Sequence, residues 1–265
     1  MEGRERGQTG PRSRSLASLR VAITRTEEDA RGLARALRAR GAEVAIHPAI
    51  RRAPPSDPRA LEGALKRLLQ GDYEGVLFTS PASVHVLRGR LGEAPFPAEI
   101  FGAVGPGTMA ALEDWGKGPT LMGPRHDGVS LAETFLSEFG ERLVGMRFLQ
   151  PRAEEGREEL SRILEAAGAR VEVVPAYRTL AREAAELAPL CRRLRRGDLD
   201  AVVFASPSAV RAVRLACGAG FLGEALGLAI GETTAEALRR AGARRVAAAE
   251  EATDAALVEA LERRF

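Results

Sequence analysis

The sequence is poor in aromatic residues and has no long apolar run. Aromatic residues make up 5% of the 265 residues, and the net charge is only +3. No aromatic residues alternate with a basic face, so we expect no nucleic-acid binding. No apolar run approaches the roughly 18–20 residues of a membrane-spanning helix, so we expect no membrane partner. Residues 1–17 are rich in Arg, Gly and Ser but lack the apolar core of a secretory signal, and we expect a disordered basic tail there.

Cysteine and histidine are also scarce. Cys191 and Cys217 have no metal-type or redox-type spacing, so we expect two separate, small, buried side chains, as suits a reducing cytosol. His47, His85 and His126 share no ligand spacing, and each is interpreted as a surface or strand-end residue. No phosphate-binding or dinucleotide-binding glycine motif is complete. We therefore expect neither a metal nor a nucleotide cofactor.

What the sequence does contain is an internal duplication. Residues 21–51 and 148–178 align without a gap, 127 residues apart, and are identical at 13 of 31 positions. Further matches follow at a spacing of 126, pairing 75–84 with 201–210, 104–108 with 230–234, and Leu131 with Leu257. This period is the length of a domain and not of a solenoid repeat. We predict two similar domains whose matching motifs line a common cleft.

Each copy alternates short apolar runs with amphipathic stretches, which is typical of βα units around a parallel sheet. Strands are predicted at 21–24, 43–47, 76–79, 100–104 and 119–122, and again at 146–150, 170–174, 201–205, 227–231 and 244–248. Helices are predicted at 27–40, 57–70, 82–90, 107–115 and 129–139, and again at 154–167, 183–196, 208–217, 233–241 and 254–264. The predicted fold is α/β, with two flavodoxin-like domains of five parallel strands each. The connectors 47–51 and 174–178 stay extended after a proline, so we expect them to pair as a two-stranded ladder.

Four strand-to-helix turns carry hydroxyl groups or glycine. Ser80-Pro81 and its copy Ser206-Pro207 combine a strong N-cap with a proline at a helix start. The segments 105–108 and 231–234 each begin with glycine and continue into a helix through threonine. Simple capping explains a single Ser-Pro pair. Four such turns indicate an anion site at the carboxyl ends of the strands, built from hydroxyls and free amides with few fixed cations.

Tyr177 marks a difference between the copies, because the first copy has Ile50 at the matching position. A phenol with an ordinary pKa near 10 is mostly protonated at neutral pH, so it can donate a proton. A tyrosine packed in the connector with its hydroxyl in water is the alternative, and the sequence leaves it open.

Several motifs together resemble one family. They are VPAYRT at 174–179, FxSPSAVR at 204–211, IGxTTAxAL at 230–238 and ATDxxLVEAL at 252–261. With the duplication, they resemble the uroporphyrinogen-III synthases over roughly residues 20–265. The resemblance implies a cofactor-free, cytoplasmic lyase of tetrapyrrole biosynthesis. Its substrate would be hydroxymethylbilane, which has eight carboxylates. Closure with loss of water and inversion of ring D would give uroporphyrinogen III.

The resemblance also implies an exchange between the copies. One domain would contain residues 18–48 and 178–265 and the other residues 52–174, joined by a ladder at 48–52 and 174–180. It places the catalytic residue at Tyr177. The substrate-binding residues are expected at Thr79, Ser80, Ser83, Gly105, Thr108, Ser130, Ser206, Ser208, Gly231, Thr233 and Thr234. We expect a monomer.

A second hypothesis comes from another class, a non-catalytic protein that senses an anion or a tetrapyrrole between its two domains. Domains of this family also occur fused to DNA-binding modules. We expect no such module here, since the sequence ends at Phe265 just after the last predicted helix. This favours the enzyme.

Overall fold

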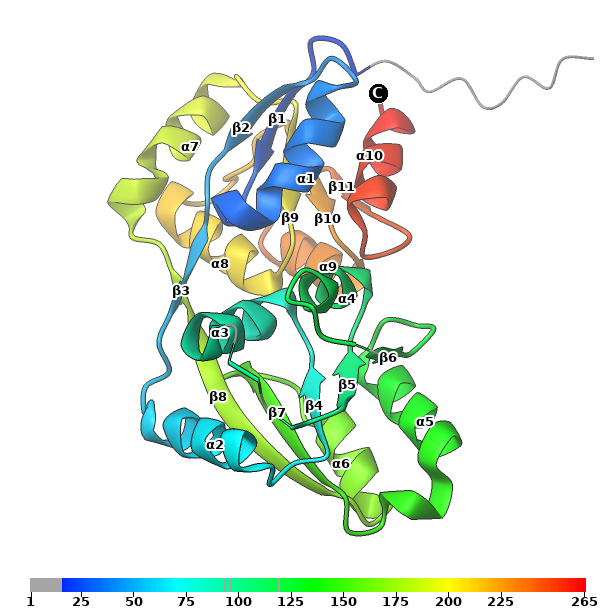
Figure 1. Cartoon of the computed structure of the whole chain (residues 1–265). Coiled ribbons are helices and arrows are strands. Elements are labelled where there is room, and N and C mark those ends of the chain that lie inside the picture. Colours follow the sequence, from blue (N-terminus) through cyan, green and yellow to red (C-terminus); the bar gives the residue numbers. More distant parts are fainter. Residues whose placement is uncertain (1–15, 93, 96, 119) are drawn as a thin grey trace, which may run out of the picture. The chain divides into compact units, whose positions relative to one another are not determined.

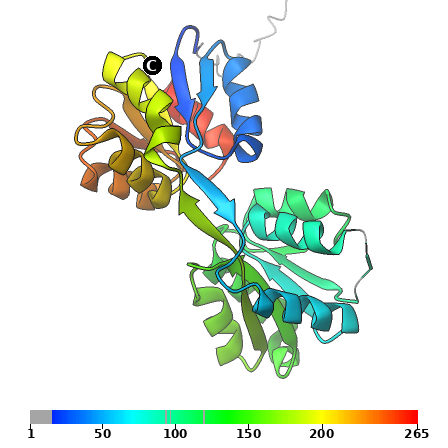
Figure 2. The same cartoon turned by 90° about the vertical axis from the view of Figure 1, so that its left-hand side faces the viewer.

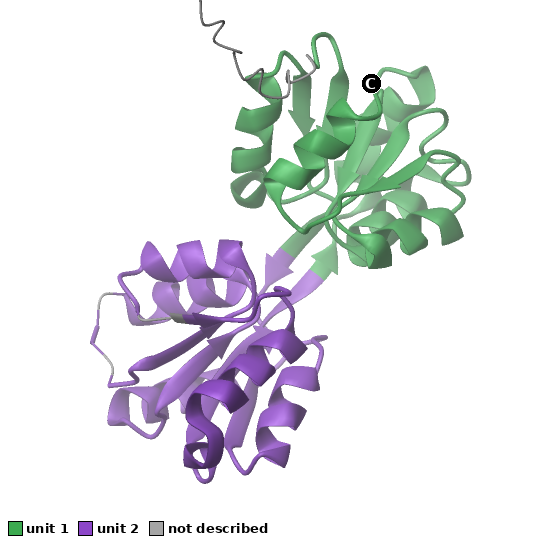
Figure 3. Ribbon diagram, turned by 90° about the vertical axis from the view of Figure 1, so that its right-hand side faces the viewer, with its two compact units in different colours: residues 1–51, 180–265 green, residues 52–179 purple. Residues whose placement is uncertain are grey.

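The computed structural model describes residues 16–92, 94–95, 97–118 and 120–265 (Figure 1). The chain forms two compact units, and it passes from one to the other twice (Figure 3). Unit 1 contains the chain up to Arg51 together with Leu180–Phe265, and unit 2 is Arg52–Thr179. Most of the tail predicted at 1–17 lies outside the described residues.

Unit 1 is a five-stranded parallel sheet in the order β11-β10-β9-β1-β2. Its strands are β1 (Arg20–Ile23), β2 (Glu43–Ile46), β9 (Ala201–Phe204), β10 (Leu226–Ala229) and β11 (Val246–Ala248). Its helices are α1 (Glu27–Arg38), α7 (Ala184–Arg196), α8 (Pro207–Cys217), α9 (Glu232–Arg240) and α10 (Asp254–Glu262). The first two strands of the first copy therefore share a sheet with the last three strands of the second copy.

Unit 2 contains the complementary set of strands, in the order β3-β8-β7-β4-β5-β6. Its strands are β3 (Ile50–Ala53), β4 (Gly75–Phe78), β5 (Ile100–Ala103), β6 (Thr120–Met122), β7 (Arg147–Ala153) and β8 (Arg170–Ala181). Its helices are α2 (Arg59–Gln70), α3 (Pro81–Leu91), α4 (Pro106–Glu113), α5 (Gly128–Phe139), the short 3-10 helix η1 (Gly140–Leu143) and α6 (Glu159–Ala166). β3 lies beside the long strand β8 (Figure 2). The predicted α/β class with parallel five-strand sheets is confirmed, and β3 adds a sixth strand here.

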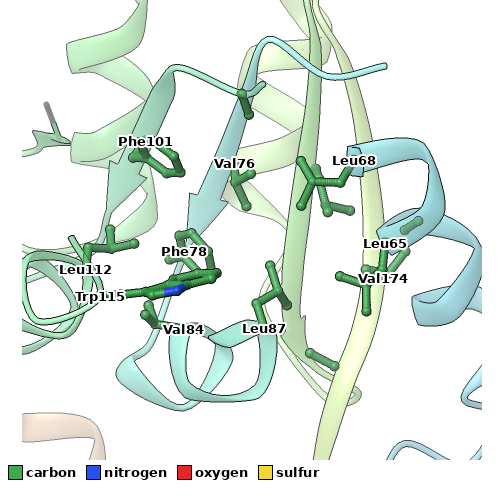
Figure 4. Close-up of a cluster of buried hydrophobic side chains, with 14 of the residues drawn as sticks. Leu65, Leu68, Val76, Phe78, Val84, Leu87, Phe101, Leu112, Trp115 and Val174 are labelled. Atoms are coloured by element: carbon green, nitrogen blue, oxygen red, sulfur yellow. The ribbon is translucent and has the colours of Figure 1, made fainter. Parts of the chain in front are cut away.

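Helices cover both faces of each sheet, and several of them, including α1, α2 and α7, do so with one apolar face. In α2, for example, Leu61, Ala64, Leu65 and Leu68 recur at helical spacing and are buried. Figure 4 shows Leu65 and Leu68 in the cluster around Val76 and Phe78 of β4. Trp115 packs in the same cluster, as predicted from the sequence. Its indole N–H donates to the Gly92 carbonyl at 3.1 Å.

Two predicted boundaries were wrong in ways that affect function. The helix predicted at 154–167 begins only at Glu159, and β7 continues to Ala153 instead of ending at residue 150. Pairing with β8 extends β7, so residues 154–158 become a loop at its carboxyl end. The tail prediction was also wrong at its last residues, because Leu16 is 2% exposed and packs in the unit 1 core.

The two cysteines are not separate side chains as predicted. Cys191 of α7 and Cys217 of α8 form a disulfide, with their Cα atoms 5.1 Å apart. Although 26 residues separate them in sequence, the packing of α7 on α8 brings them together. Because the two cysteines are bonded, they do not support the expectation of a reducing compartment. No helix among the described residues is long and apolar enough to cross a membrane.

Candidate functional site

Unit 2 has a pocket of about 420 Å³ where the carboxyl ends of β4, β5 and β7 meet the starts of three helices. This is the edge of a parallel sheet at which ligands usually bind. The residues that line it are Thr79, Ser80, Val104, His126, Asp127, Gly128, Val129, Arg152, Ala153, Gly156, Arg157, Glu159, Leu160 and Tyr177. Three of the predicted site residues, Thr79, Ser80 and Tyr177, are therefore brought together here.

Ser80 reaches the pocket because it caps helix α3. Its backbone is extended, and its Oγ accepts a hydrogen bond from the amide of Ser83 at 3.3 Å. Pro81 occupies the first helical position, where a missing N–H costs nothing. The strand β4 is buried along its whole length, so Thr79 and Ser80 emerge at a fixed point from the core.

Tyr177 reaches the pocket through an irregularity in β8. Arg152 of β7 lies opposite Pro175, but the next residue, Ala153, lies opposite Tyr177. Ala176 is thus an extra residue in β8, a bulge of the kind that redirects side chains beside functional sites. The tyrosine is 9% exposed, and its Oη lies 3.0 Å from Ser80 Oγ. The Tyr177 hydroxyl therefore contacts a protein side chain, unlike in the alternative interpretation, in which it points into water.

The direction of this hydrogen bond follows from the neighbouring hydroxyl groups. Ser83 Oγ donates its proton to the Ser80 carbonyl at 2.8 Å. It can therefore only accept in its 3.2 Å contact with Ser80 Oγ, which makes Ser80 the donor there. With its proton used, Ser80 Oγ accepts from Tyr177. Tyr177 therefore donates its phenol proton to Ser80 Oγ, and both residues line the pocket.

A second helix start is provided by α5. Asp127 caps it, and its Oδ1 accepts from the Ser130 amide at 2.6 Å. The amides of Gly128 and Val129, in the first turn, have no acceptor within the helix and can bind an anion. His126, just before this helix, has a left-handed backbone with φ of 54°, a conformation that is strained for residues other than glycine. His126 was interpreted from the sequence as a surface or strand-end residue, and its position in the pocket was not predicted.

Two arginines in the pocket were not among the predicted site residues. The Arg152 side chain is only 12% exposed; its Nη1 donates to the Arg157 carbonyl at 2.8 Å, and its Nη2 lies 3.3 Å from Glu158. Glu158 is 66% exposed, so water screens this ion pair. Asp127 and Glu159 bring negative charge to the same pocket. The signal that was available is the duplication, because Arg25 and Arg152 occupy matching positions.

Other predicted residues of unit 2 support the pocket from behind. Ser83, Thr108 and Ser130 are essentially fully buried. Thr108 Oγ1 donates to the Val104 carbonyl at 2.7 Å, and Ser130 Oγ accepts from the Arg125 amide at 3.1 Å. Gly105 caps α4 with φ of 80°, which favours glycine. In this structure these side chains hold the helix starts and do not face the pocket.

Unit 1 repeats the same features at its own helix starts. Ser206 caps α8 by accepting from the Ala209 amide at 3.2 Å, and its Oγ lies 2.9 Å from that of Ser208. Gly231 precedes α9, where Thr233 is exposed and Thr234 is 3% exposed. No group of three or more His, Cys, Asp or Glu in the described part of the chain is arranged to hold a metal.

Comparison with known proteins gives one consistent family. A family model described as uroporphyrinogen-III synthase HemD matches residues 31–259. A uroporphyrinogen-III synthase of Synechococcus elongatus is 29% identical over 163 residues, which are 59% of each chain. The match thus spans about three fifths of that relative's length.

Two solved structures share the fold. A mutant uroporphyrinogen III synthase of Thermus thermophilus has a TM-score of 0.57 at 20% identity, covering 93% of this chain and 98% of its own. A uroporphyrinogen-III synthetase of Helicobacter pylori has a TM-score of 0.60 at 18% identity, covering 93% of this chain and all of its own. Since the family model matches most of the sequence, this chain belongs to the uroporphyrinogen-III synthase family.

Proposed function

We propose that the protein is a uroporphyrinogen-III synthase that closes hydroxymethylbilane to uroporphyrinogen III with loss of water and inversion of ring D. Family membership supports this reaction class. The observation that carries it to this chain is the Tyr177 hydroxyl, 3.0 Å from Ser80 Oγ in a pocket at the carboxyl edge of the sheet. We propose no cofactor, since the reaction needs no oxidant or reductant.

Tyr177 is the proposed general acid. Its proton would pass to the terminal hydroxyl of the substrate, and the C–O bond would then break with release of water. The electron-rich pyrrole supplies the electron pair for this departure. For inversion, the cation formed is attacked by the α-carbon of ring D that carries the bridge to ring C. That bridge bond then breaks and re-forms at the other α-carbon of ring D, which loses its proton. Ser80 would turn its own hydroxyl toward the phenolate and stabilise the developing charge, as oxyanion donors do.

The rest of the site has to bind carboxylates and hold the chain in a bent conformation. The starts of α3 and α5, with the open amides of Gly128 and Val129, would bind them in unit 2. In unit 1 we propose the same role for the hydroxyl-bearing starts of α8 and α9. Each start contributes about 0.3–1 kcal/mol in exposed settings, so several are needed.

The decisive experiment gives the purified protein hydroxymethylbilane and separates the product isomers. The type III isomer is expected at a rate well above the uncatalysed one. Type I isomer alone, at the rate of the spontaneous closure, would refute the proposal. Binding of the substrate without turnover would instead indicate a sensor.

The role of Tyr177 is tested by Tyr177→Phe, which removes the hydroxyl and keeps the ring. General acids usually contribute about 10²–10⁴-fold, and we expect kcat to fall by about 10- to 10⁴-fold. Tyr73→Phe is the matched control, because the Tyr73 hydroxyl is bonded to Glu172 at 2.6 Å and does not line the pocket. A Tyr177→Phe rate equal to that of Tyr73→Phe would return Tyr177 to a packing role.

A further inference from the structure

The two copies of the duplicated arginine have different partners. Arg25 of unit 1 forms an ion pair with Asp254 at 2.6 Å, with its side chain 15% exposed. Arg152 of unit 2 is buried to a similar degree, with 12% exposed. They are 127 residues apart, with Arg25 just after β1 and Arg152 near the carboxyl end of β7. The same buried cation is thus placed at the same point of both sheets.

The difference lies at the first residue of the last α-helix of each sequence copy. Asp254 is the first residue of α10, and Gly128 is the first residue of α5. These positions are 126 residues apart, the spacing that also pairs Leu131 with Leu257. Unit 1 therefore has a carboxylate matched to its arginine, whereas unit 2 has a glycine without a side chain. The two units share the fold, but the start of α5 has no carboxylate at the position where the start of α10 has Asp254.

Within the described residues, Arg152 pairs instead with Glu158, at 3.3 Å and largely in water. Its guanidinium is held by the Arg157 carbonyl at 2.8 Å, and the loop packs closely against one side of the side chain at Gly156. A Cβ atom at Gly156 would lie 2.9 Å from Arg152 Nη1 and 3.0 Å from its Cδ. The arginine is held in one position and lines the pocket, and the start of α5 offers it no counterpart of the Asp254 carboxylate that pairs with Arg25.

We infer that Arg152 binds a carboxylate of the substrate, which occupies the place that Asp254 fills in unit 1. The guanidinium can form two parallel hydrogen bonds with such a group, a geometry that a lysine does not provide. Glu159 and Asp127 line the same pocket; Asp127 is bonded to the Ser130 amide, and in the described structure Arg152 pairs with Glu158 instead of either. The inference deepens the proposed function and rests on it for the identity of the substrate.

The first test measures binding without turnover. Uroporphyrin, a stable octacarboxylate, is titrated into the protein by calorimetry at several salt concentrations. Arg152→Gln should weaken binding by about 10- to 100-fold, as expected for charged hydrogen bonds, and should flatten the dependence on salt. Arg152→Lys should recover part of the loss. Arg25→Gln, the counterpart in unit 1, should change binding by less than about twofold.

The second test restores the missing carboxylate. A Cβ atom at Gly128 makes only ordinary contact, 3.4 Å from Leu160 Cβ, so Gly128→Asp and Gly128→Asn are equally accommodated. If Arg152 binds the ligand, the aspartate should compete with it, and Gly128→Asp should bind at least about 10-fold more weakly than Gly128→Asn. In turnover assays the difference should appear in KM more than in kcat.

The outcomes separate this inference from the proposed reaction. Loss of uroporphyrin binding in Arg152→Gln, in a protein that makes no type III isomer, would support the anchor and refute the reaction. Normal turnover with equal affinities for wild type, Arg152→Gln and both Gly128 variants would support the reaction and overturn the anchor. Circular dichroism of each variant identifies a loss of folding. If Arg152→Gln does not fold, the comparison of Gly128→Asp with Gly128→Asn tests the inference in its place.

Discussion

The disulfide in unit 1 gives a quantitative prediction about stability. Cys191 is 2% exposed in the cluster between α7, α8 and the sheet, and Cys217 packs against the same cluster. The bond closes a loop with a sequence separation of 26 residues. The loop-closure relation for unfolded chains then gives an entropy loss of about 12 cal/mol/K, or about 3.5 kcal/mol at 25 °C. This is a large share of the roughly 5–15 kcal/mol typical of a domain.

The perturbation is Cys217→Ser, or reduction of the wild type, followed by urea unfolding. With a typical slope of about 1–3 kcal/mol per molar urea, the midpoint for unit 1 should fall by about 1–3 M. Hydrogen exchange of peptides from α7 and α8 reports on unit 1. Trp115 is the single tryptophan and lies in unit 2, so its fluorescence follows the other unit.

The Cys217→Ser variant is also the control for the effect of reductant. Reductant should lower the unit 1 midpoint of the wild type and leave that of Cys217→Ser unchanged, because that variant has no bond to lose. Equal midpoints for oxidised and reduced wild type would refute the reasoning. Labelling of both thiols in protein kept under non-reducing conditions would refute the bond itself.

Two further predictions concern polar groups that the fold buries. His47 has Nε2 buried without a hydrogen-bond partner in the described structure, and burial, followed by the charge of Arg193, lowers its pKa. The unfolded chain then binds the proton more readily, so stability should fall as the pH drops below about 6.5, by at most about 1.4 kcal/mol per pH unit and less for a half-buried ring. His47→Gln should flatten the free energy of unfolding between about pH 7 and 5.5, and an unchanged slope would contradict this. Gln150 is fully buried, and among the described residues neither end of its amide has a partner. Gln150→Met should therefore raise the free energy of unfolding by about 1–3 kcal/mol in chemical denaturation, whereas an equal loss would mean that the amide is paired in solution.

Much of the fold was predictable because it depends on patterns that recur along the chain. The duplication predicted two similar α/β units, and apolar spacing predicted all five strands of the unit 1 sheet and five of the six in unit 2. The helix expected at 154–167 shows where such patterns are insufficient. Within residues 154–158 only Gly156 disfavours a helix, and pairing between β7 and β8 extends the strand and leaves this segment as a loop. Tertiary hydrogen bonding outweighed local preference there.

The pocket was predictable to a different degree. Ser80 and Tyr177 were found because their sequence signals are local, a cap before proline and a substitution in a repeat. Arg152 was missed although the duplication marks it, because its match to Arg25 does not reveal that the partners differ. His126 was missed because its place depends on a left-handed backbone, which no sequence spacing encodes. The disulfide was missed for the same reason, since only the packing of α7 on α8 brings its cysteines together.

The duplication also helps to separate residues that hold the fold from residues that act in chemistry. A fold needs the same support in both units, so a capping serine at the start of α3 and of α8 is explained by structure alone. Chemistry acts on one point of the substrate and needs a given group only once. Positions that differ between the copies, Ile50 against Tyr177 and Asp254 against Gly128, therefore point to function. The second difference also singles out the matched Arg152, because it changes the partner of that arginine. At both positions the residue in unit 2 lines the pocket: Tyr177 and Gly128 do so together with Arg152. On this reasoning we propose that the two units have diverged in role, with the proposed acid and the proposed charged anchor both in unit 2.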